Sequence, residues 1–217
     1  MNIGVLGTGM VGGAIGTRLI QLGHAVKMGS RTADNEKAVE WSKTNGGNAS
    51  HGTFAQATAF GELLFNCTHG VASLDVLRQA GEGNLGGKVL IDISNPLDFS
   101  KGMPPTLSIS NTDSLGEQIQ KAYPRVRVVK ALNTVNCMVM VNPDLINGGD
   151  HTLFMCGNDA AAKSEVKTML HSFGWKTENI LDLGDITNAR GTEMMLPLWV
   201  RLYGAFQSPM FQFKIVR

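Results

Sequence analysis

Short, continuous apolar runs divide the first 135 residues of the chain at regular intervals. A run that is apolar at nearly every position predicts a strand covered on both faces, as in a parallel sheet packed between helices. Such runs lie at residues 3–6, 25–28, 62–67, 88–93 and 125–132, with a shorter strand near 49–51. Segments with helical character follow them, at residues 15–22, 34–43, 54–59, 71–79 and 114–122. This alternation predicts an α/β fold with a doubly wound, mostly parallel sheet.

The rest of the chain has a different pattern. It is predicted to hold an irregular stretch, a strand, a helix and another strand, at residues 137–150, 153–156, 160–173 and 177–181. A helical segment then begins near residue 188, and Pro197 should kink it or start a new helix. We therefore predict two domains, residues 1–135 and a smaller C-terminal region of residues 136–217, which holds a strand-helix-strand extension and the terminal helices.

The first strand is followed at once by the sequence Gly-Thr-Gly-Met-Val-Gly and then by a helix. Gly7 permits a tight turn, Gly9 lets the backbone approach a pyrophosphate, and Gly12 lets the helix pack close to the strand. The start of that helix presents unpaired N–H groups and a positive dipole end to the phosphates. The context predicts a Rossmann-type dinucleotide site in residues 1–135, against the alternative of a purely structural glycine turn. The predicted contacts are Gly7, Thr8, Gly9, Met10, Val11 and Gly12.

The second strand ends in Ser30 and Arg31, where an NAD site usually carries an acidic residue for the ribose 2′-hydroxyl. A hydroxyl and a guanidinium suit a 2′-phosphate instead. Lys37, early in the next helix, supplies a further positive charge. These residues favour NADP(H) over NAD(H), although a solvated loop charge is the alternative for Arg31.

Polar residues also follow the later strands, at the sheet edge where open α/β folds bind ligands. His69 invites a catalytic role, but a single histidine there is more often an ordinary loop residue. Asn95, Asn133 and Thr134 are predicted to lie across the nicotinamide as positioning groups in catalysis. The remaining predicted cofactor contacts are Cys67, Thr68, His69, Ser94, Asn95 and Ala131.

Composition excludes several other classes of protein. A formal net charge of +1, without a basic cluster, gives no case for binding nucleic acid or an anionic membrane. The three cysteines are far apart and show no metal-ligand spacing, so no metal site is predicted. No apolar stretch approaches the ~20 residues that span a bilayer. Because the first strand begins at residue 2, we expect no targeting segment and a cytoplasmic protein.

The Gly-Thr-Gly, Gly-Ser-Arg and Lys-Ala-Leu-Asn-Thr segments together resemble the NADPH:coenzyme F-420 (F420) oxidoreductase family. The reductase domain of the STEAP ferric reductases belongs to the same wider group. The resemblance covers nearly the whole chain, including residues 128–134, 156–159 and 181–198. It implies hydride exchange between NADP(H) and a deazaflavin or flavin ring stacked against the nicotinamide. The deazaflavin enzymes have His at the position of Asn133, whereas the ferric reductases have Asn, so the resemblance leaves a flavin or another small acceptor open.

The residues agree with a reaction that needs little acid–base help, since hydride transfer between stacked rings depends on proximity and orientation. There is no Tyr-x-x-x-Lys pair, and the chain is too short for a long all-helical second domain. Two alternatives remain: an NADPH-dependent reductase of a small carbonyl or imine, and a non-catalytic NADP-sensing module. The surplus of large apolar residues after residue 194 predicts that this segment closes the acceptor pocket and forms a symmetric homodimer.

Overall fold

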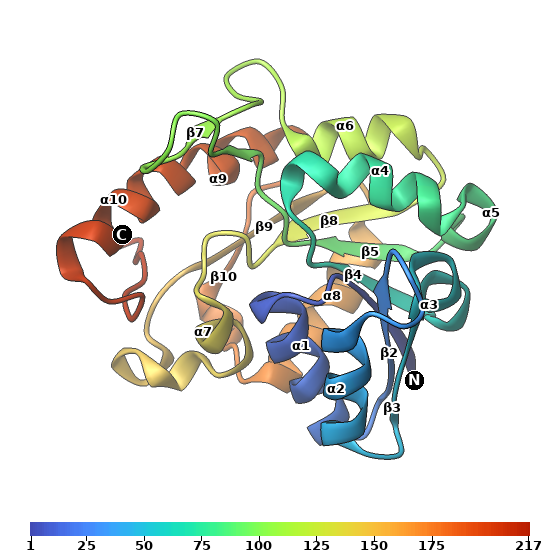
Figure 1. The fold of residues 1–217 in the computed structure, drawn as a ribbon. Helices are drawn as coiled ribbons and strands as arrows, with labels where there is room; N and C mark the ends of the chain where they lie inside the picture. The colour runs from blue at the N-terminus through green and yellow to red at the C-terminus, as the bar shows by residue number, and fades with distance from the viewer.

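The computed structural model describes all residues, 1–217, and its centre is one eight-stranded sheet (Figure 1). The strand order is β10-β9-β8-β5-β4-β1-β2-β3. Every neighbouring pair is parallel except β8 and β9, which are antiparallel. The eight strands are β1 (Asn2–Leu6), β2 (Ala25–Ser30), β3 (Ala49–Thr53), β4 (Leu63–Asn66), β5 (Val89–Asp92), β8 (Arg127–Ala131), β9 (Leu153–Gly157) and β10 (Ile180–Asp182). The predicted doubly wound, mostly parallel sheet is confirmed.

Helices cover both faces of this sheet, with α4 and α6 above it and α1 and α2 below it in Figure 1. The ten helices are α1 (Met10–Gln21), α2 (Glu36–Asn45), α3 (Phe54–Phe60), α4 (Gly70–Ala80), α5 (Glu82–Leu85), α6 (Leu115–Ala122), α7 (Cys137–Val141), α8 (Ala160–Phe173), α9 (Ala189–Met194) and α10 (Leu196–Phe206). Four single 3₁₀ turns lie at Pro143–Leu145, Asn147–Gly149, Thr177–Asn179 and Ile186–Asn188. A small hairpin, β6 (Leu97–Asp98) and β7 (Thr106–Leu107), stands apart from the main sheet.

The continuous apolar runs supply both halves of the core. Along β4, Leu63 and Phe65 face the layer of α1 and α8, whereas Leu64 faces the layer of α3, α4 and α6. Strand β5 divides in the same way, with Leu90 on the second face. Because side chains alternate across a strand, a run that is apolar throughout buries both faces. This burial holds the carboxyl ends of β1, β2, β4 and β5 at one edge.

The C-terminal part extends the same sheet rather than forming a separate one. Strands β9 and β10 pair in parallel, and helix α8 connects them along the chain as a crossover. The last strand begins at Ile180 instead of residue 177, because residues Thr177–Asn179 form a 3₁₀ turn. Pro197 lies in the first turn of α10, where its missing N–H costs no hydrogen bond, so it starts a new helix instead of kinking one. The division at residue 135 stays a prediction.

The last residues lead away from the sheet and then return to it. Helices α9 and α10 project to one side (Figure 1), and the tail after them contacts residues 150–152. There the N–H of Thr152 donates to the carbonyl of Phe213 at 2.9 Å, and Lys214 pairs with Asp150 at 2.5 Å. No helix combines the length and apolar character needed to cross a membrane.

Candidate functional site

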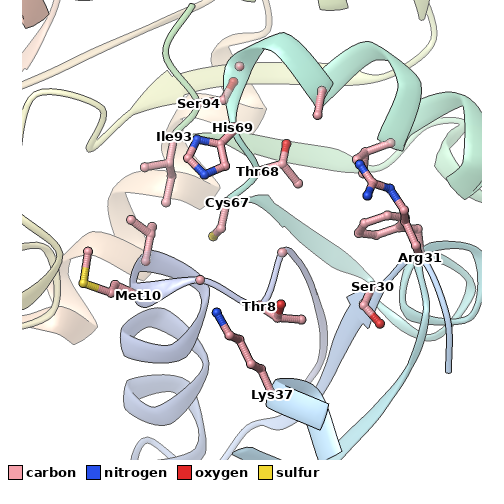
Figure 2. A pocket seen from close by; sticks show the side chains of 18 of the residues that line it. Thr8, Met10, Ser30, Arg31, Lys37, Cys67, Thr68, His69, Ile93 and Ser94 are labelled. Atoms are coloured by element: carbon pink, nitrogen blue, oxygen red, sulfur yellow. The ribbon is translucent and has the colours of Figure 1, made fainter. Parts of the chain in front are cut away.

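A cavity of about 590 Å³ opens at the carboxyl ends of β1, β2, β4 and β5. Figure 2 shows side chains from these strand ends and from the starts of α1 and α2 around it. Most of the residues proposed from the sequence line it: Gly7, Thr8, Gly9, Met10, Val11, Ser30, Arg31, Lys37, Cys67, Thr68, His69, Ser94 and Asn95. Gly12, Ala131, Asn133 and Thr134 are buried beside or beneath the wall and do not line the cavity. Whether these residues bind a nucleotide stays a prediction.

The three glycines of the turn between β1 and α1 serve different needs. Gly7 has φ +117°, and a Cβ there would lie 2.8 Å from the carbonyl oxygen of Cys67. A Cβ on Gly12 would lie 2.1 Å from the carbonyl oxygen of Gly7, so the fold itself requires both glycines. At Gly9 a Cβ would meet nothing within 4 Å and would project from a residue that lines the cavity. Of the three glycines, only Gly9 leaves room for a side chain within the fold, and that side chain would enter the cavity.

The first turn of α1 also suits an anion. Gly9 is the N-cap residue and has no side chain to accept from the exposed N–H groups. No acidic residue lies in the first turn. A helix start with unpaired N–H groups and a positive dipole end binds phosphate well. The turn thus has the features of an anion-binding helix start.

Two positive charges lie at the β2 side of the cavity. Neither Arg31 nor Lys37 forms an ion pair within the chain, and Ser30 lies between their side chains in Figure 2. The hydroxyl of Ser30 is buried and donates to the carbonyl oxygen of Thr32 at 2.5 Å. Ser30 therefore shapes this loop, and the two cations have no partner within the chain, which is the arrangement that an anion site needs.

The β4 and β5 side of the wall is set by buried hydrogen bonds. Thr68 donates its hydroxyl to the side-chain oxygen of Asn66 at 2.7 Å, and Ser94 donates its hydroxyl to Asp92 at 2.6 Å. Burial, and then the charge of Asp92, raises the pKa of the Cys67 thiol far above its ordinary value. A raised pKa favours the neutral thiol, which is the less reactive form of cysteine.

Two of the proposed positioning residues contact each other directly. The Nδ2 of Asn133 donates to Oδ1 of Asn95, and the Nδ2 of Asn95 donates to the backbone oxygen of Asn133, both at 2.9 Å. The side-chain oxygen of Asn133 is buried and accepts no hydrogen bond. The turn after β8 places Leu132 at φ 65°, which redirects the chain immediately before this pair. Asn133 thus fixes the orientation of Asn95 at the cavity wall.

Part of the wall has no signal in the sequence. Phe54, Val76, Leu97 and Phe99 line the cavity, although their spacing indicates only ordinary core or loop positions. A cluster of charged side chains inside the protein was also not predicted; Asp92, Lys130 and Glu193 form it, and it is called here the buried ion cluster. Burial lowers the pKa of Lys130, but the two adjacent carboxylates more than offset this, and its pKa is raised. No local signal in the sequence points to Glu193, because its partners are far away along the chain.

Comparison with known proteins gives consistent matches. A family model described as NADP oxidoreductase, coenzyme F420-dependent, matches residues 2–96. The crystal structure of a protein from Arthrobacter sp. FB24, described as a putative F420-dependent NADP-reductase, shares 50% identity with a TM-score of 0.95, and the match covers 100% of both chains. The F420-dependent NADP reductase of Methanocaldococcus jannaschii is 29% identical over 137 residues, which are 63% of this chain and 59% of that protein. Metalloreductase STEAP3 of Rattus norvegicus is 26% identical over 204 residues, which are 91% of this chain and 38% of that protein.

The chain spans less than two thirds of the length of the last two relatives. The Arthrobacter protein, in contrast, matches from end to end and has half of its residues in common with this chain. These matches confirm the resemblance inferred from the sequence motifs. They also show that the chain is an NADP-dependent oxidoreductase. The chain belongs to the coenzyme F420-dependent NADP oxidoreductase family.

Proposed function

We propose that this enzyme transfers a hydride between NADP(H) and a deazaflavin such as F420, or a flavin-like acceptor. The observation that carries the proposal is the layout of the cavity across the sheet. Unpaired cations lie at the β2 end, a glycine turn and helix start lie in the middle, and Ser94 and Asn95 lie at the β5 end. An extended NADP molecule has its 2′-phosphate, pyrophosphate and nicotinamide in this order. Two relatives that are described as F420-dependent NADP reductases support F420 as the acceptor.

The β5 end of the cavity suits a flat, largely apolar ring. Met10, Ile93, Leu97 and Phe99 line it, and Met10 is 84% exposed. Large exposed apolar side chains beside a cavity mark a surface that a ligand can cover. Hydride transfer between two stacked rings needs this kind of positioning more than it needs a proton donor.

Arg31→Ala tests whether the part of the cavity at the end of β2 recognises the 2′-phosphate of NADPH. We expect NADPH affinity to fall about tenfold to a hundredfold, because a charge-assisted contact contributes roughly 1.5–3 kcal/mol. NADH affinity should stay nearly unchanged. Calorimetric titration with both nucleotides measures this. The control is Arg125→Ala, which removes an exposed arginine just before the amino end of β8, whereas the cavity lies at the carboxyl ends of the strands. An equal loss for NADH and NADPH would show that Arg31 does not recognise the phosphate.

The acceptor is tested by NADPH oxidation against a panel of candidates. The panel should contain F420, FMN, FAD, a ferric chelate, and small carbonyls and imines. We expect the highest kcat/KM with F420 or a flavin. Turnover of carbonyls or imines alone would replace the proposal with the second alternative, and tight NADPH binding without turnover of any acceptor would support a sensing module.

We further propose that residues 136–217 close the acceptor pocket and form a homodimer. The segment carries a row of aromatic contacts, with Trp199 stacked on Tyr203 at 6.0 Å and packed on Phe211 at 5.1 Å between ring centroids. Leu198 and Phe206 on the same helix are 52% and 59% exposed. Apolar side chains left exposed on a projecting helix are typical of an interface.

Removing residues 206–217 should make the protein monomeric and abolish acceptor turnover. NADPH binding should persist, because the glycine turn lies in the other part of the chain. Light scattering and calorimetry measure the two properties independently. A monomeric wild-type protein would exclude the homodimer, and unchanged turnover after truncation would exclude a role in closing the pocket.

The cellular location proposed is the cytoplasm. Cys67, Cys137 and Cys156 are all free thiols, and one of them is fully buried in the core. Free cysteines are normal in a reducing compartment, where disulfides seldom form.

A further inference from the structure

The buried ion cluster brings three charged side chains together from three different elements. Asp92 lies on β5, Lys130 on β8 and Glu193 on α9, and their side chains are 0%, 0% and 2% exposed. The Nζ of Lys130 lies 2.8 Å from Oδ2 of Asp92 and 2.8 Å from Oε1 of Glu193. It also donates to the carbonyl oxygen of Ser94 at 2.5 Å. All three ammonium protons are therefore in use.

Both carboxylates are ionised, because each of their four oxygens faces a group that can only donate. Asp92 accepts from the N–H of Ser94 at 3.2 Å through Oδ1 and from Lys130 through Oδ2. Glu193 accepts from the N–H of Leu115 at 2.8 Å through Oε2 and from the N–H of Gly116 at 3.0 Å through Oε1. A proton on any of these oxygens would displace one donor.

The cluster therefore carries two negative charges and one positive charge. Its net charge is −1, in a part of the protein that water does not reach. The start of α6, whose first N–H groups bind Glu193, offsets part of this charge through the helix dipole. A negative excess remains.

The position of this excess relative to the cavity is set by Ser94. Lys130 binds its carbonyl oxygen, and Asp92 accepts from both its N–H and its hydroxyl. Ser94 itself lines the cavity, at the end farthest across the sheet from Arg31. The cluster thus lies directly behind the wall against which the proposed function places the nicotinamide.

We propose that the buried ion cluster favours the oxidised nicotinamide over the reduced one, so that bound NADPH is a stronger hydride donor than free NADPH. When the C4–H bond of the dihydronicotinamide breaks, its electron pair leaves with the hydrogen for the acceptor ring, and the nicotinamide becomes a cation. A fixed negative charge in a poorly screened interior stabilises that cation and leaves the neutral ring nearly unaffected. This inference rests on the proposed function.

Glu193→Gln tests the inference through two dissociation constants measured without any acceptor. We expect the ratio of the Kd of NADP⁺ to the Kd of NADPH to rise about tenfold to twentyfold, the change that loss of a unit charge on the order of 10 Å away gives at an effective dielectric constant near 20. For a two-electron couple, a tenfold change corresponds to about 30 mV in the potential of the bound nucleotide.

Glu117→Gln is the matched control. It also removes a carboxylate between α6 and α9, but Glu117 is paired with Arg190 at 2.5 Å and lies near the surface. Its ratio of dissociation constants should equal that of the wild type. Loss of α6–α9 packing alone would lower the affinity for both nucleotide forms together and leave the ratio unchanged.

Asp92→Asn provides a second test that keeps the contacts of Glu193 with α6, and it should change the ratio in the same direction. A folded variant of either residue that binds NADP⁺ and NADPH in the wild-type ratio would overturn the inference, while the proposed function would stand. A wild-type protein that binds neither nucleotide would instead contradict the proposed function.

Discussion

Gly9→Val should abolish binding of NADPH and NADH while the protein stays folded. Gly9 has φ −80° and ψ −172°, a region that valine adopts readily, and a Cβ there has no neighbour within 4 Å. The added side chain therefore fits the protein but occupies the space where the pyrophosphate must approach the start of α1. Loss of two or more hydrogen bonds to a charged group corresponds to at least about a hundredfold in affinity. Calorimetry measures the affinity, and circular dichroism checks the fold.

Gly13→Ala is the control for this experiment. A Cβ on Gly13 also meets nothing within 4 Å, but Gly13 does not line the cavity. Nucleotide affinity should be unchanged, and alanine in the helix should raise stability slightly. Wild-type NADPH affinity in Gly9→Val would mean that the turn has a structural role only.

This contrast among glycines shows what the motif can and cannot establish. Strand, glycine turn and helix follow one another in the sequence, so the turn and its place at the sheet edge were predictable. The distinction between Gly7 and Gly9 was not, because it depends on the carbonyl oxygen of Cys67, which approaches from another strand.

The sheet was largely predictable for a similar reason. Each strand is a short apolar run with its own local pattern, and the helices between parallel strands set the topology. The antiparallel pairing of β8 with β9 lay outside that reasoning, because an apolar run does not encode strand direction. The candidate site was predicted from strand ends, yet the contact between Asn95 and Asn133 joins residues 38 positions apart.

The buried ion cluster was beyond sequence analysis altogether. Lys130 lies within an otherwise apolar strand. A lysine at such a position is expected to reach solvent, because lysine is almost never fully buried unless it is paired. Its partner Glu193 contacts Leu115 across 78 positions in sequence. Only the folded chain shows that α9 closes over the strand ends of β5 and β8 and supplies the second carboxylate.

Lys130→Met should lower the free energy of unfolding by about 3–5 kcal/mol at neutral pH, since it leaves two buried carboxylates without their counter-ion. Methionine fills a similar volume, so loss of charge rather than a cavity dominates the effect. Urea unfolding measures the difference. Lys121→Met, which removes an exposed lysine from α6, should change stability by no more than about 0.5 kcal/mol.

The pH dependence of this loss identifies its cause. In Lys130→Met, two buried carboxylates repel each other without a counter-ion, and uptake of one proton by the folded state relieves this repulsion. The folded variant then binds more protons than its unfolded chain, so the destabilisation grows as pH rises. We expect the difference from the wild type to be smaller at pH 5 than at pH 8. A loss of the same size at both pH values would indicate poor packing of methionine instead of two uncompensated charges.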